Sequence, residues 1–136
     1  MIPKFRAYDK ETGSMRDVLV IDYLNGDVDL SGGLIERSFQ DVVLMQSTCL
    51  RDKNGVEIFE GDIAETRQSD LSSVSYEMVG GVVTYDSDNG MFKLVRKYGS
   101  KFHSFTIWLD NVEVIGNVWE NPNLLKGGRL KDESDR

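Results

Sequence analysis

The chain has 136 residues, of which 40% are hydrophobic and 29% are charged, and its formal net charge is -7. This composition predicts one folded domain or two very small ones, and it excludes an intrinsically disordered chain. No apolar run approaches the ~20 residues that a membrane-spanning helix needs, so we expect no membrane segment, and the N-terminus does not resemble a signal peptide. The acidic balance argues against non-specific nucleic-acid binding, which depends on neutralising phosphates.

The first 45 residues predict short strands separated by turns. Apolar alternation or β-branched side chains mark four segments, 4–9, 18–24, 28–30 and 42–45. Polar, glycine-containing turns separate them at 10–14, 25–27 and 31–33. The segment 34–38 fits either a short helix or a loop. We take residues 1–45 as an N-terminal β segment.

The central stretch, residues 44–65, predicts a tight hairpin. Asn54-Gly55 is the strongest short-range hairpin signal, and it favours a type I′ turn because both central residues of that turn need positive φ. The strand after this turn is expected to end near Phe59. Gly61-Asp62 then predicts a second turn, from which a new strand leaves through Ile63.

Five closely spaced strands between Ile63 and Trp119 fit a small antiparallel barrel, although a sandwich remains open. Gly80-Gly81 lies inside one of these strands and predicts a bulge or a sharp bend. Residues 86–90 predict a hairpin loop, and Asn121-Pro122 predicts the start of a short helix. We take 46–125 as the central hairpin with the barrel, and 126–136 as a disordered tail.

Three blocks are spread over the chain: KFRAYDK at 4–10, the stretch from Leu44 to Ile63 and EVIGNVWENPNLL at 113–125. Together they resemble the YopX family, small proteins encoded by phages and prophages of Gram-positive bacteria. The resemblance implies a mainly β protein whose C-terminal part is an SH3-type barrel. It implies no activity and no catalytic residue. Where the family tends to have an aromatic residue and a glycine, this chain has Ser47 and Cys49, which bears on the local turn geometry.

The reactive side chains do not predict an enzyme. His103 is the only histidine and Cys49 the only cysteine, so no zinc-type set exists and no intrachain disulfide can form. We expect a structural His103 and a buried, small apolar Cys49. A single cysteine also fits a reducing cytoplasm.

Acidic residues are frequent near the central hairpin, and such carboxylates could act in acid-base catalysis or hold Mg²⁺. They are Glu57, Glu60, Asp62 and Glu65. No phosphate-binding glycine loop accompanies them. The loop 86–90 superficially resembles a calcium loop, but its twelfth position holds Lys97 in place of a glutamate. We therefore expect no catalytic residue, no metal site and no cofactor.

One segment favours a different function class. Basic residues interleaved with aromatic ones are typical of grooves that bind single-stranded nucleic acid. The candidate residues are Lys93, Arg96, Lys97, Lys101, Phe102 and Trp108. The simpler interpretation, which we prefer, is that the aromatic side chains fill a core while the basic ones coat the surface.

The sequence thus favours a non-enzymatic phage or prophage accessory protein of unknown function. We expect it to act in the cytoplasm of the bacterial host through protein contacts, either with a host protein or with itself as a homo-oligomer. A nucleic-acid-binding small-barrel module is the alternative. The apolar residues of the N-terminal strands suggest self-association, because those strands have little to pack against except the barrel or another copy.

Overall fold

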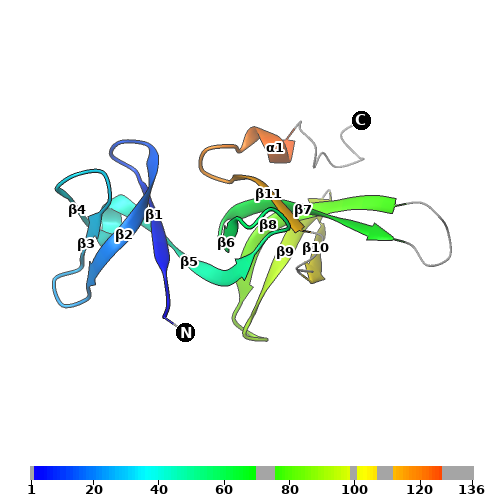
Figure 1. Cartoon of the computed structure of the whole chain (residues 1–136), viewed down its shortest axis with the longest axis horizontal. Coiled ribbons are helices and arrows are strands. Elements are labelled where there is room, and N and C mark those ends of the chain that lie inside the picture. Colours follow the sequence, from blue (N-terminus) through cyan, green and yellow to red (C-terminus); the bar gives the residue numbers. More distant parts are fainter. Residues whose placement is uncertain (1, 70–75, 99–100, 107–111, 127–136) are drawn as a thin grey trace. The chain divides into compact units, whose positions relative to one another are not determined.

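The computed structural model describes residues 2–69, 76–98, 101–106 and 112–126 of the chain. The chain forms two compact units, Met1–Cys49 and Leu50–Arg136. The described residues form eleven β-strands, one 3-10 helix and one short α-helix (Figure 1). The expectation of a mainly β chain is therefore confirmed. Neither helix within these residues has the length and apolar character that a membrane span requires.

The first unit is an antiparallel sheet built mostly from consecutive strands. Its strand order is β4-β3-β2-β1-β5, so β5 returns to pair with β1 after three successive hairpins (Figure 1). A 3-10 helix, η1, leads into β5. The bounds are β1 Phe5–Asp9, β2 Ser14–Asp22, β3 Asp27–Leu30, β4 Ile35–Ser38, η1 Phe39–Asp41 and β5 Val42–Arg51.

Segment 34–38, expected as a helix or a loop, contains strand β4. It pairs with β3 in register, from Leu30 opposite Ile35 to Asp27 opposite Ser38. The strand is only four residues long and its middle is charged, so alternation could not reveal it. Tertiary contacts fix it, since Ile35 packs on the core and Arg37 reaches a carboxylate on another strand.

The first unit has a hydrophobic core of its own. Four buried side chains form its centre: Ala7, Val28, Leu30 and Val42. Five partly buried side chains pack against them: Val18, Ile21, Ile35, Phe39 and Leu44. The premise that the N-terminal strands lack partners within their own segment is therefore wrong.

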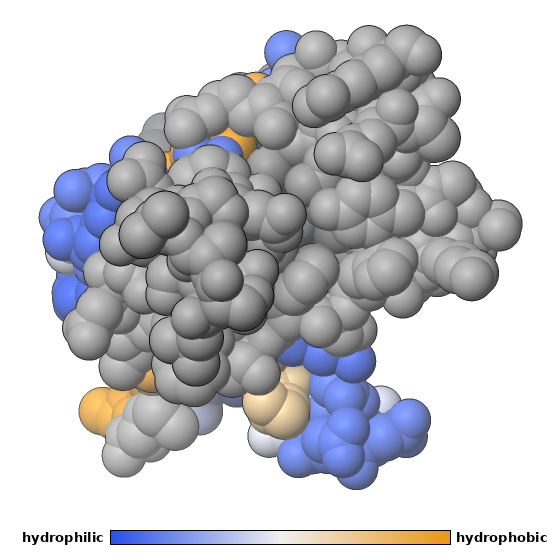
Figure 2. Space-filling model, turned by 90° about the vertical axis from the view of Figure 1, so that its right-hand side faces the viewer, coloured by the Kyte–Doolittle hydropathy of each residue, from blue (hydrophilic) through white to orange (hydrophobic). Residues whose placement is uncertain are grey.

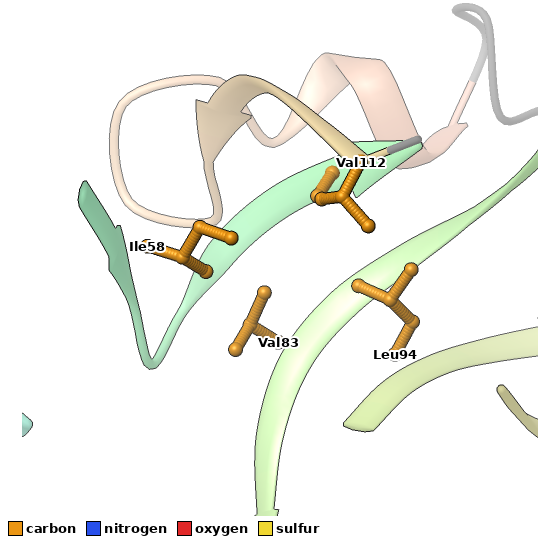
Figure 3. Packing of buried hydrophobic residues seen from close by; sticks show 5 residues of the cluster. Ile58, Val83, Leu94 and Val112 are labelled. Carbon is orange, nitrogen blue, oxygen red and sulfur yellow. The ribbon is translucent and has the colours of Figure 1, made fainter. Parts of the chain in front are cut away.

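The second unit contains a five-stranded antiparallel sheet of order β10-β9-β8-β7-β11, while β6 pairs with β5. Its core consists of Ile58, Ala64, Val83, Leu94 and Val112 (Figure 3). Among the described strands no pairing joins β10 to β11, so the structure establishes this sheet and not an SH3-type barrel. The bounds are β6 Glu57–Phe59, β7 Asp62–Ser69, β8 Tyr76–Asp86, β9 Met91–Tyr98, β10 Lys101–Thr106, β11 Val112–Asn117 and α1 Asn123–Lys126.

The same five-residue turn closes three of the hairpins. Each copy begins with aspartate and ends with glycine, at 9–13, 22–26 and 86–90. In each, the glycine N–H donates to the aspartate carbonyl at 2.8 or 2.9 Å, and the glycine φ lies between 66° and 72°. The aspartate side chain also accepts bonds from within its own turn. The loop predicted at 86–90 is therefore confirmed as a hairpin turn.

The hairpin predicted at Asn54-Gly55 is present, but its turn is not type I′. Gly55 has φ +82°, but Asn54 does not have the positive φ that a type I′ turn also needs. Among the described residues, Cys49 is the only non-glycine residue with positive φ. The Gly55 N–H donates to the Asp52 carbonyl at 3.0 Å, and the Asp52 N–H donates to the Val56 carbonyl at 2.7 Å. This pattern is that of a type I turn followed by a glycine bulge. The Asp52 side chain selects it by accepting from the amides of Asn54 and Val56.

Gly81 permits a close approach between two strands of the second sheet. The pairing of β7 with β8 runs through Gly80 and Gly81 without a register shift, so the predicted bulge is absent there. A Cβ atom at Gly81 would lie 2.5 Å from the Val95 carbonyl oxygen. Only a residue without a side chain fits beside that carbonyl.

We expect Gly81→Ala to lower the free energy of unfolding by about 1–3 kcal/mol, because β9 must shift to admit the methyl group. Urea denaturation followed by circular dichroism measures the change. Ser87→Ala, at an exposed position of the adjacent turn, is the control and should leave stability unchanged. Equal stability of Gly81→Ala and wild type would contradict the close approach.

Candidate functional site

Five of the six residues proposed for nucleic-acid binding fall on β9 and β10. The pairing of these strands sets Phe102 opposite Lys97 and His103 opposite Arg96, and Lys101 begins β10. Only the backbone of these paired residues and of Lys101 is described, and Trp108 lies outside the described residues. Neighbouring strands thus carry most of the candidate group at the edge of the sheet.

Lys93 is the one member of that group whose side chain is described, and its charge is already paired. Its Nζ lies 3.2 Å from Oδ2 of Asp86, and the lysine side chain is only 26% exposed. A side-chain bond from Asn89, followed by the Lys93 contact, lowers the pKa of Asp86 to about 2. Lys93 therefore stabilises the turn at 86–90.

The acidic residues near the central hairpin have partners within the protein. Asp62 and Glu65 are buried, and Asp62 Oδ2 accepts from the Phe59 N–H at 2.8 Å, which closes the turn between β6 and β7. Glu57 and Glu60 also have partners. Within residues 2–69, 76–98, 101–106 and 112–126, no three His, Cys, Asp or Glu side chains converge as metal ligands would.

Asp9, at the end of β1, organises a polar cluster in the first unit. It is fully buried, and Nε and Nη2 of Arg37 donate to its two carboxylate oxygens at 3.0 and 3.3 Å. The Thr12 hydroxyl donates at 2.6 Å and the Glu11 N–H at 3.2 Å. Nε of Arg16 lies 3.5 Å away as a second ion-pair partner. The carboxylate thus joins β1, β2, β4 and the first turn.

The environment of Asp9 holds it in the charged form. Burial alone would raise its pKa, but the bonds from Thr12, Arg37 and Glu11 outweigh that effect and lower the pKa to about 2. Both of its oxygens are occupied by donors. A carboxylate bound in this way is a poor proton acceptor, so Asp9 is suited to a structural role.

Asp52 plays a similar part in the second unit. It is buried, and its Oδ1 accepts from the amides of Asn54 and Val56 at 2.8 and 2.9 Å. Its Oδ2 accepts from the Val114 amide on β11 at 2.9 Å. Burial raises its pKa, and these three bonds more than reverse that effect, so the pKa is lowered overall. Asp52 ties the central turn to the last strand.

Ser47 and Cys49 occupy a distorted part of β5. Cys49 has φ +64°, a left-handed conformation that favours glycine, and its side chain is exposed. The expectation of a buried, apolar Cys49 is therefore wrong. Ser47 is buried, and its hydroxyl oxygen accepts from the Cys49 N–H at 3.0 Å. This bond helps to hold the unusual backbone.

We expect Cys49→Gly to raise the free energy of unfolding by about 1 kcal/mol, because glycine adopts a left-handed conformation without a Cβ clash. Thermal denaturation under reducing conditions measures the gain. Cys49→Ala is the control, since it removes the thiol but keeps the Cβ atom. If alanine stabilises as much as glycine, the strain at this position is not the cause.

Large apolar side chains remain exposed in the first unit. Five lie on or beside β2 and β4: Leu19, Val20, Tyr23, Leu24 and Leu34. Figure 2 shows another face of the molecule, on which the visible described residues are mainly hydrophilic and hydrophobic areas are small. Exposed apolar residues that gather around a hollow are a feature of interaction sites.

Two shallow hollows adjoin Leu19. The first has a volume of about 340 Å³ and is lined by residues 3–5 and 18–21. The second has a volume of about 260 Å³ and is lined by residues 19, 29–30 and 33–36. We call the two together the β2 groove. Its two exposed leucines, Leu19 and Leu34, were not among the candidate functional residues that the sequence pattern singled out.

Comparisons with known proteins agree on the fold. The family model described as YopX protein matches residues 4–126. The crystal structure of protein EF1440 from Enterococcus faecalis is 28% identical, with 93% of this chain and 99% of that chain covered and a TM-score of 0.52. The crystal structure of protein yopX from Bacillus subtilis is 23% identical, with 91% and 96% covered and a TM-score of 0.51. No curated protein matches the chain.

Proposed function

This chain belongs to the YopX family, and from that premise we propose that it is an accessory protein of a phage or prophage that acts through protein contacts. Its place of action is the cytoplasm of the bacterial host, and its partner is a host protein or a second copy of the chain. The resemblance of the three sequence blocks supports the phage origin, and the single cysteine fits a reducing compartment.

The observation that carries the proposal is the exposed apolar surface around the β2 groove. Leu19 is 64% exposed and Leu34 is fully exposed, although the unit has a complete core without them. Apolar side chains that a core does not need, placed beside hollows, are typical of contact surfaces for other proteins. The acidic net charge of -7 favours solubility of the free protein.

A non-enzymatic role is part of the same proposal. The two buried aspartates with the most donors, Asp9 and Asp52, use their oxygens to hold turns and strands together. These contacts support an architectural role for the residues that a catalytic hypothesis would consider first.

The alternative is a nucleic-acid-binding module, and one observation favours it. The pairing of β9 with β10 places Phe102 opposite Lys97, which sets an aromatic and a basic residue side by side at a sheet edge. In this alternative the second unit is a small barrel of the SH3 type. The return of β11 to pair with β7 and the close approach at Gly81 support such curvature.

Affinity capture distinguishes the two functions. The tagged chain is incubated with a lysate of Enterococcus faecalis, the source of one similar protein, with and without nuclease, and sedimentation reports self-association. We expect a protein partner or a dimer that survives nuclease and is lost in a Leu19→Ser, Leu34→Ser double variant. Met91→Ser, an exposed apolar position of the second unit, is the control. Capture that disappears with nuclease would favour the alternative.

A further inference from the structure

Three turns of the described structure contain an Asn-Gly pair, at 25–26, 54–55 and 89–90. Asparagine is one of the thermally labile residues. A following glycine makes it more reactive, because no Cβ atom hinders the approach of the glycine nitrogen to the asparagine side chain. All three asparagines are exposed. The pairs are therefore candidate sites of spontaneous deamidation, a covalent modification that needs only water as a reactant.

The backbone is alike around the three pairs. Each glycine has positive φ, between 66° and 82°, and none of the three asparagines does. Each glycine N–H donates to the carbonyl of an aspartate earlier in the turn, at 2.8 to 3.0 Å. The attacking nitrogen is thus held to a similar degree at all three positions, so the backbone gives no reason for their reactivity to differ.

The asparagine side chains are held differently. Nδ2 of Asn25 donates to Oδ2 of Asp22 at 2.7 Å. Nδ2 of Asn89 donates to Oδ2 of Asp86, also at 2.7 Å. Attack by the glycine nitrogen requires the side chain to turn toward the backbone, which breaks such a bond. Two of the three side chains are therefore restrained by a short bond to a charged acceptor.

Asn54 lacks a side-chain bond of this strength. Its Nδ2 lies 3.5 Å from Oε1 of Glu113, beyond the range of a good N–H···O bond. The other carboxylate oxygen of Glu113 lies 3.4 Å from Nζ of Lys53. The aspartate of this turn, Asp52, uses its side chain to accept from three backbone amides. The side chain of Asn54 is thus the least restrained of the three.

We propose that Asn54 is a site of spontaneous deamidation in the folded protein, whereas Asn25 and Asn89 are protected. The Gly55 nitrogen attacks Cγ of Asn54, a C–N bond forms, and Nδ2 leaves as ammonia together with the proton from the glycine nitrogen. Water then opens the resulting succinimide ring at either of its two carbonyls. The products are aspartate and isoaspartate, in which the backbone passes through the former side chain. This modification is independent of the proposed function.

Modification of Asn54 will loosen the central turn from β11. Isoaspartate adds a methylene group to the backbone before Gly55, so the Gly55 N–H moves away from the Asp52 carbonyl that it bonds. Either product also places a new negative charge near Asp52 and Glu113, and like charges repel each other. Because Asp52 also holds the Val114 amide, the modified form should melt at a lower temperature than the unmodified one.

Mass spectrometry of tryptic peptides tests the proposal on the full chain. Cleavage after lysine and arginine separates the three pairs into peptides 17–37, 54–67 and 68–93, each of which contains a single asparagine. The folded protein is incubated at mildly alkaline pH and then digested, and deamidation raises the mass of the peptide. We expect peptide 54–67 to be modified about tenfold faster than the other two, a difference that one hydrogen bond can produce. In chain unfolded by urea, the control, all three should react at similar rates.

Two variants connect the modification to the side chains. Asp22→Ala removes the acceptor of Asn25, so peptide 17–37 should react severalfold faster than in wild type while peptide 54–67 is unchanged. Asn54→Gln has a longer side chain that reacts slowly. Its melting temperature should stay constant during incubation, whereas that of wild type should fall as modified protein accumulates. Circular dichroism checks that each variant is folded at the start.

The assignment of Asn54 is overturned by any of three results. The first is that peptide 17–37 or 68–93 of the folded protein reacts as fast as 54–67. The second is that no peptide of the folded protein reacts in the time that the unfolded chain needs. The third is that Asp22→Ala leaves the rate at Asn25 unchanged. None of these results depends on a binding partner, so the proposed function is tested separately.

Discussion

Replacing Asp9 with asparagine will lower the free energy of unfolding by about 3 kcal/mol, because it leaves the guanidinium of Arg37 without its carboxylate partner. This loss of stability is at the lower end of the range for breaking a buried ion pair. The reason is that the side chains of Arg16 and Arg37 keep some contact with solvent. Urea denaturation measures it. Asp17→Asn, an exposed aspartate on the adjacent strand, is the control and should change stability little.

The effect of Asp9 will depend on pH with a defined sign. Its pKa is lowered from the ordinary 3.8 to about 2 in the folded protein, so the charged form is favoured by folding. Its contribution is therefore complete above the unfolded value and is lost as pH falls from 3.8 toward 2. The stability difference between wild type and Asp9→Asn should shrink over that interval. A difference independent of pH would contradict the assignment.

Replacing Asp52 with alanine will lower the free energy of unfolding by about 3 kcal/mol, because three backbone amides lose their common acceptor. The central turn and β11 should lose protection from hydrogen exchange together, since the same carboxylate bonds both. The matched control is Lys53→Ala. Lys53 is the exposed neighbour, and its ion pair with Glu113 should contribute less than about 1 kcal/mol. Protection that falls only in the turn would show that the bond to Val114 is dispensable.

Local features of the sequence were sufficient where a turn and its flanking residues determine the structure. The hairpins at 25–27 and 86–90 follow from short polar segments that contain Asn-Gly. The short helix predicted at Asn121-Pro122 begins at Asn123, and the Asn121 side chain accepts from the Asn117 amide. The prediction of a type I′ turn at Asn54-Gly55 is wrong because it depended on these two residues alone. Nothing in the Asn54-Gly55 pair reveals that the Asp52 side chain bonds two amides of that turn.

Long-range contacts limited the prediction of functional features. Arg37 is 28 residues from Asp9, and the strand that carries it, β4, was itself not predicted. The β2 groove depends on a register shift at Leu19, which reverses the face that simple alternation assigns. The unusual backbone at Cys49 could be anticipated, because the family that the sequence resembles tends to have glycine at this position. The structure agrees with that preference, since Cys49 has positive φ.

The strand order of the first unit has a consequence for the time course of folding. The order β4-β3-β2-β1 joins neighbours in sequence, and tight turns close the first two hairpins, so each closure involves a short loop with a small entropic cost. The pairing of β1 with β5 instead joins residues such as Ala7 and Leu44, which are distant in sequence. Contacts of low sequence separation form fastest. The three hairpins should therefore form early and β5 should join last, so that β1 spends the intermediate stage as an open edge.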